Sequence, residues 1–94
     1  MLVTSTSYIA EFIGTFFFIL SIFFSGGNPL IIAGSLAIVI FMIAGISGSH
    51  VNPAISFAMF MDGQLKPVEL VYYVIAQLAG AVSAYFTYVN LRRV

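Results

Sequence analysis

The sequence predicts an all-α membrane protein with three transmembrane helices and one shorter re-entrant half-helix. Two observations lead to this fold class. First, 62% of the 94 residues are hydrophobic and only 6% are charged, whereas a soluble domain carries roughly 25% charged residues. Second, the apolar residues form three runs long enough to cross a bilayer and one run that is too short. We therefore expect a multi-pass integral membrane protein embedded in the lipid bilayer.

The first long apolar run covers residues 7–24, and Glu11 is the only ionisable residue within it. At about 1.5 Å per residue this run reaches roughly 27 Å, close to the ~30 Å hydrocarbon thickness. A signal peptide is the competing interpretation, but no Lys or Arg precedes the run and a carboxylate lies inside it. The run is therefore predicted to be a transmembrane helix.

Two further spans begin at prolines. A cluster of turn residues ends at Asn28 and Pro29 and leads into the second span, residues 30–46, because Asn suits an N-cap and Pro the first helical position. Pro67 opens the last span, residues 67–88, which has tyrosines towards both ends, as aromatic belts require. These tyrosines are Tyr72, Tyr73, Tyr85 and Tyr88.

Each span also carries small residues four positions apart. Close backbone contact through such stripes is a main source of helix association in lipid. The stripes are Ala10 and Gly14, Ala33 and Ala37, and finally Ala76, Gly80 and Ala84. We expect helix packing at Gly14, Gly80 and Ala84; the alternative is that Gly and Ala are simply common in apolar helices.

A short apolar run, residues 53–61, follows a stretch of small and polar residues after the second span. As a helix it covers only about 13 Å and cannot cross the bilayer. Irregular backbone at membrane depth is tolerated only where it lines a cavity or is buried in protein. We therefore expect this half-helix to enter the membrane and return to the same side, with Asn52 at its N-terminus.

This geometry has electrostatic consequences. A helix N-terminus carries roughly half a positive charge, and Asn52 adds an amide donor at that point. A water or hydroxylated solute would be held there by its oxygen, and a cation would be repelled. The carbonyls of Gly48, Ser49 and His50 lack helical partners and can form a ladder of acceptors leading to Asn52. The pattern is typical of a pore for small neutral polar solutes.

Residues 47–56, which contain Asn52-Pro53-Ala54, resemble the first signature loop of the aquaporin family, the major intrinsic proteins. Residues 11–16 look like the family's first-helix motif, and residues 76–81 are similar to its third helix. The resemblance implies six spans and two half-helices in two inverted repeats, whose two Asn-Pro-Ala motifs meet at mid-membrane. This chain matches the first repeat, and the second motif and the filter arginine of the second repeat are missing from it.

The resemblance also implies roles for matching residues. Asn52 looks like the central donor, and the three loop carbonyls look like the acceptor ladder. Glu11 and Gln77 resemble the buried polar residues that hold the loop, although Glu11 could instead extend to the nearby interface. Ile32 falls at the second-helix position of the selectivity filter. The His50 ring is expected to make structural hydrogen bonds rather than to bind a metal or switch protons.

The predicted function is passive transport of water or small neutral solutes such as glycerol. Since three spans cannot surround a channel, we expect two half repeats to assemble, as a homo-oligomer, an antiparallel dimer, or with a second aquaporin half. Lys66 lies on one side and Arg92 and Arg93 on the other, a near balance that permits both orientations. The alternatives are a fragment of a full-length aquaporin, a structural or modulatory subunit, and a small transporter coupled to protons through Glu11.

Other function classes find no support in the sequence. It contains no paired nucleophile and base, no phosphate loop and no metal-ligand spacing, so neither an enzyme nor a cofactor is expected. The net charge is zero and no basic cluster occurs, which excludes nucleic acid as a predicted partner.

Overall fold

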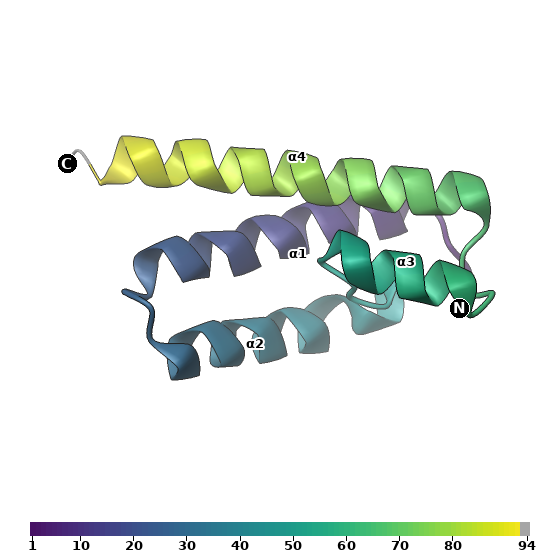
Figure 1. The fold of residues 1–94 in the computed structure, drawn as a ribbon, viewed down its shortest axis with the longest axis horizontal. Coiled ribbons are helices and arrows are strands. Elements are labelled where there is room, and N and C mark those ends of the chain that lie inside the picture. Colours follow the sequence, from purple (N-terminus) through teal and green to yellow (C-terminus); the bar gives the residue numbers. More distant parts are fainter. Residues whose placement is uncertain (93–94) are drawn as a thin grey trace.

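The computed structural model describes residues 1–92 and folds them into four helices (Figure 1). They are α1 (Ser5–Phe24), α2 (Pro29–Ser47), α3 (Pro53–Met61) and α4 (Pro67–Leu91). By length and composition α1, α2 and α4 can each cross a membrane, whereas α3 has only 9 residues. The predicted fold class is therefore confirmed. The helices differ from the predicted runs only at their ends, since α1 begins two residues earlier and α4 ends three residues later.

Helices α2 and α3 begin with the same Asn-Pro arrangement. Asn28 Oδ1 accepts hydrogen bonds from the backbone N–H groups of Leu30 at 2.9 Å and Ile31 at 3.3 Å. Asn52 Oδ1 accepts one from Ala54 N–H at 2.8 Å. In both cases proline takes the first helical position, where its missing N–H costs nothing and its fixed φ favours the helix.

Helix α1 is the central element of the bundle. It packs against both α2 and α4, and α3 packs along α4. Figure 1 shows that α3 begins beside the middle of the bundle and ends where α4 starts. The chain therefore turns into the bundle after α2 and comes back to the same end. As a result α4 finishes at the opposite end of the bundle from the start of α1.

Small residues allow α1 to approach its two neighbours closely. A Cβ atom on Gly80 of α4 would lie 2.6 Å from the carbonyl oxygen of Phe12 in α1, and one on Gly14 would lie 2.5 Å from Ile43 Cδ1 in α2. Ala84 is completely buried. By contrast, Ala33 and Ala37 of α2 are exposed, so the predicted stripe on α2 makes no such contact within the described chain.

The assignment of Tyr73 to an aromatic belt is wrong. Its exposed fraction is 0%, and its hydroxyl donates to the backbone carbonyl oxygen of Ser47 at 2.7 Å. Tyr73 lies on the face of α4 that covers the end of α2, whereas its neighbour Tyr72 is exposed. The face of the helix, and not the distance from its end, decides the environment of each ring.

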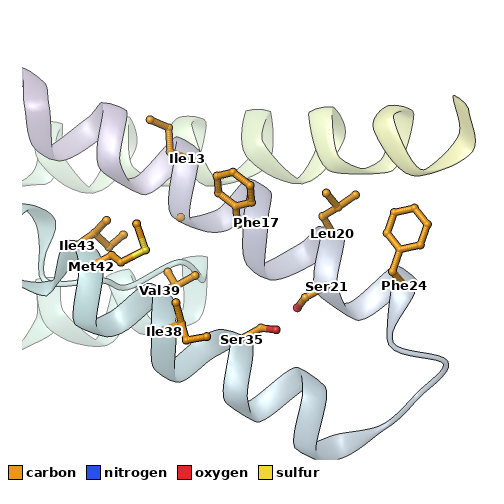
Figure 2. Close-up of a pocket in the computed structure, with 11 residues that line it drawn as sticks. Ile13, Phe17, Leu20, Ser21, Phe24, Ser35, Ile38, Val39, Met42 and Ile43 are labelled. Atoms are coloured by element: carbon orange, nitrogen blue, oxygen red, sulfur yellow. The ribbon is translucent and has the colours of Figure 1, made fainter. Parts of the chain in front are cut away.

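An apolar groove of about 460 Å³ separates parts of α1 and α2. Figure 2 shows side chains of both helices facing this space, with the hydroxyl-bearing residues Ser21 and Ser35 on opposite walls. Within the described chain α2 buries only Val39, Ile43 and Ser47. Most of the apolar surface of α2 is therefore left for lipid or for another protein segment.

Candidate functional site

Glu11 of α1 lies at the centre of a buried hydrogen-bond network. One carboxylate oxygen, Oε2, accepts from Ser47 Oγ at 2.6 Å and from His50 N–H at 3.0 Å. The other, Oε1, accepts from Val51 N–H at 2.8 Å and from Gln77 Nε2 at 2.9 Å. These bonds use about the full acceptor capacity of a carboxylate. With an exposed fraction of 0%, the side chain points inward and does not extend to an interface.

The loop between α2 and α3 turns its N–H groups inward. Gly48 N–H donates to the carbonyl of Ala44 at 2.9 Å and Ser49 N–H donates to Ser47 Oγ at 3.1 Å. The next two N–H groups are those that bind Glu11. Among residues 1–92, no donor bonds to the carbonyl oxygens of Gly48, Ser49 or His50. The protein thus pairs the backbone N–H groups of residues 48–51 and leaves three consecutive carbonyl acceptors without a donor, while the Ser49 hydroxyl is buried without a partner among the described residues.

This arrangement requires an unusual backbone. The φ angles are +88° at Gly48, +53° at Ser49 and +48° at Val51. Positive φ suits glycine but is strained for other residues, and most of all for a β-branched one. The hydrogen bond from Val51 N–H to Glu11 therefore does more than satisfy a donor, because it holds a backbone conformation that valine alone disfavours.

A second layer of polar side chains supports the network, and sequence reasoning missed it. Gln77 Nε2 donates a further bond to Ser56 Oγ at 2.8 Å, and Ser56 Oγ lies 2.9 Å from His50 Nδ1. Ser7 Oγ donates to the carbonyl oxygen of Ile46 at 2.7 Å. The other missed members are Ser47 and Tyr73, described above. A helical spacing of four could have indicated three of them, since Ser7 precedes Glu11, Tyr73 precedes Gln77 and Ser56 follows Asn52 by four residues.

Asn52 marks the start of α3 beside the middle of the bundle (Figure 1). Its Oδ1 caps the helix, and within the described chain its side-chain N–H₂ group has no acceptor. Asn52, Pro53 and Ala54 are all exposed. An amide donor at the positive end of a helix therefore remains available to a polar molecule. Of the three residues whose carbonyls accept no bond within the described chain, Gly48 is exposed, whereas Ser49 and His50 are buried.

Ile32 is separate from this network. It is half-buried in α2, fifteen residues before Ser47, which corresponds to roughly 22 Å along a helix. No group of three metal-ligating side chains occurs in the part of the chain that the structure describes. The structure thus brings together Glu11, Gln77 and the loop, and leaves Ile32 apart.

Comparison with known proteins identifies the family. The model of the major intrinsic protein family matches residues 27–92. The chain belongs to the major intrinsic protein family. This match confirms the resemblance stated from the signature loop, and together with the three long apolar helices it makes the chain an integral membrane protein.

Similar proteins come from bacteria, plants and animals. The chain is 36% identical to a glycerol uptake facilitator protein-like protein of Lactiplantibacillus plantarum, over 82% of its own length. It is 37% identical to a probable aquaporin of Oryza sativa over 81% of its length, and 36% identical to the lens fiber major intrinsic protein of Lithobates pipiens over 79%. The match covers 39%, 38% and 32% of these three relatives. The chain therefore spans less than two fifths of the relatives it matches.

Proposed function

We propose that this chain is a subunit of an aquaporin-type channel for passive transport of water or small neutral solutes such as glycerol. The observation that carries the proposal is the Asn52 amide, exposed at the start of α3 with no acceptor in the described chain. Unpaired polar groups at membrane depth are tolerated only where they face water or protein. Asn52 and the three loop carbonyls that accept no hydrogen bond within the described chain are therefore our candidates for the wall of an aqueous path.

We further propose that the path is surrounded by helices on all sides only when two half repeats assemble. Among the described residues, helices α2 and α4 each pack along α1 and meet each other at the hydrogen bond from Tyr73 to Ser47, so the described helices form no complete ring around Asn52. A second copy inserted in the opposite orientation would complete the inverted repeat and bring a second Asn52 to the first. Lys66 and Arg92 precede and follow α4 and so favour neither orientation strongly; Arg93 lies outside the described residues.

The names of the relatives support the choice of solute, since the chain resembles both a glycerol uptake facilitator and a probable aquaporin. Among the described residues, Ile32 stays our candidate for the selectivity filter. An aliphatic side chain at that position does not distinguish water from glycerol, so both solutes belong in the test.

The test is an osmotic jump on liposomes that contain the purified chain. Water or glycerol permeability well above that of empty liposomes is the expected result. Permeability equal to that of empty liposomes would contradict the channel and favour a structural subunit or a fragment. Solute uptake that requires a proton gradient would instead favour a transporter. The network argues against that last alternative, because all four hydrogen bonds of Glu11 are already made within the protein.

A further inference from the structure

The His50 ring is held at one nitrogen and open at the other. Its Nδ1 lies 2.9 Å from Ser56 Oγ. Its Nε2 has no hydrogen-bond partner among residues 1–92, and it is not one of the unpaired polar atoms that are sealed from solvent. His50 borders a hollow of about 270 Å³, and a Cβ on Gly48 would lie 3.2 Å from Nε2. The open nitrogen therefore lies beside Gly48 and is not sealed from solvent. The hollow that His50 borders is also lined by Met1 and by the residues of the turn before α4, Gly63, Gln64 and Leu65.

The positions of the protons in the network follow from Glu11. Its Oε1 already accepts from Val51 N–H, so the Gln77 atom 2.9 Å away must be the amide nitrogen; an amide oxygen there would oppose two acceptors. The second proton of this nitrogen points to Ser56 Oγ at 2.8 Å. Gln77 Oε1 is left sealed and unpaired, as expected if the carboxylate imposes the orientation of the amide.

The hydrogen bond from Gln77 also determines how Ser56 bonds to the His50 ring. Its oxygen accepts from Gln77, and its own hydroxyl proton also needs an acceptor. Within the described chain, the one acceptor at hydrogen-bond distance from this hydroxyl is Nδ1 of His50. A neutral ring that accepts at Nδ1 carries its proton at Nε2.

We propose that Ser56 fixes His50 as the Nε2–H tautomer, so that Nε2–H is a donor in the hollow for the oxygen of a water or a hydroxylated solute. The role of the donor in solute passage rests on the proposed function, whereas the tautomer does not. The opposite tautomer would leave the Ser56 proton without an acceptor and would present a bare nitrogen to the hollow. Ser56 acts through His50 and is a positioning residue.

The sequence makes a direct test feasible, because His50 is the one histidine among the 94 residues. Labelling with ¹⁵N-histidine gives one pair of ring signals in solid-state NMR of the full chain in lipid bilayers near neutral pH. We expect a protonated Nε2, a bare Nδ1, and magnetisation transfer from water to Nε2. A protonated Nδ1 would overturn the tautomer, and no transfer from water would overturn the donor role.

Variants test the part played by Ser56. Ser56→Thr keeps a hydroxyl and should keep both ring signals, whereas Ser56→Ala should shift the Nδ1 signal towards that of a nitrogen without a donor. Ser35→Ala is the matched control, since it removes a hydroxyl outside the network, and it should leave the signals unchanged. An unmoved Nδ1 signal in Ser56→Ala would refute the positioning role. If Ser56→Ala does not fold, the tautomer measured in the wild-type chain still tests the proposal. The NMR signals do not depend on transport. A failure of the proposed channel function, seen as absent osmotic permeability, is therefore distinguished from a failure of the tautomer assignment.

Discussion

At the scale of single residues, the Glu11 side chain makes the most hydrogen bonds of any side chain in the part of the chain that the structure describes. Its carboxylate accepts four hydrogen bonds, two of them from backbone N–H groups of the loop. Removing an acceptor leaves each buried donor unpaired at about 1–3 kcal/mol. Stability should therefore depend on whether the replacement side chain still carries an oxygen.

We expect Glu11→Gln to be better tolerated than Glu11→Leu. The amide oxygen of Gln keeps part of the acceptor capacity and fits the same space, whereas Leu leaves the N–H groups of His50 and Val51 without partners. Thermal unfolding in detergent measures the difference. Equal melting temperatures for the two variants would mean that the hydrogen bonds to Glu11 contribute little.

Gly80 allows a second prediction at this scale. In Gly80→Ala the new Cβ would meet the backbone oxygen of Phe12 at 2.6 Å, so α1 and α4 must move apart, at a cost of about 1–3 kcal/mol. Gly34→Ala is the control, because nothing lies within 4 Å of a Cβ there. Thermal unfolding should show a loss for Gly80→Ala and none for Gly34→Ala. A similar effect of both changes would contradict the close contact.

At the scale of the helix, α3 is defined by its ends. Asn52 caps its N-terminus beside the middle of the bundle, and its C-terminus returns to the end where α4 begins (Figure 1). The short length keeps the helix from crossing, and the Asn-Pro start fixes where its positive end lies. The helix thus presents the partial positive charge of its N-terminus beside the middle of the bundle.

Asn52→Asp tests this charge. A full negative charge should outweigh roughly half a positive one in low dielectric, so the barrier to cations should fall in an assembled pore. Paired osmotic and cation-flux assays on liposomes measure the change. Asn28→Asp is the matched control, because Asn28 caps α2 in the same way at the far end of the bundle, and cation flux should stay low. Wild-type liposomes that already leak Na⁺ or K⁺ would count against the barrier.

At the scale of the whole molecule, the two described ends of the chain lie at opposite ends of the bundle. Since the chain contains no Cys, single-cysteine variants Thr4→Cys and Asn90→Cys can report each end separately. In an antiparallel assembly a membrane-impermeant thiol reagent should label each site in about half of the copies. Complete labelling of both sites from one side would contradict the half-helix topology, and labelling of one site alone would contradict opposite orientations.

Much of the architecture was predictable because local rules decide it. The apolar runs gave the three spans, and Pro29, Pro53 and Pro67 marked the helix starts. The environment of Tyr73 was not predictable, because a tyrosine near the end of a span suits both an aromatic belt and a buried hydrogen bond. Likewise the bond from Ser7 to the carbonyl of Ile46 depends on how α2 ends beside α1. Such contacts depend on how the helices are arranged in the folded chain, and they leave only a weak helical periodicity in the sequence.

The hydrogen bonds of Glu11 also set an order of events during synthesis. Its donors lie 36 to 40 residues later in the end of α2 and the loop, and 66 residues later at Gln77. When α1 leaves the ribosome, none of these partners exists, and an intramembrane carboxylate without partners is costly. The strained backbone at Val51 likewise gains its support only once α1 is beside it. The loop therefore reaches its final conformation late. Its hydrogen-bond network is complete only when α4 has been synthesised and has joined the bundle.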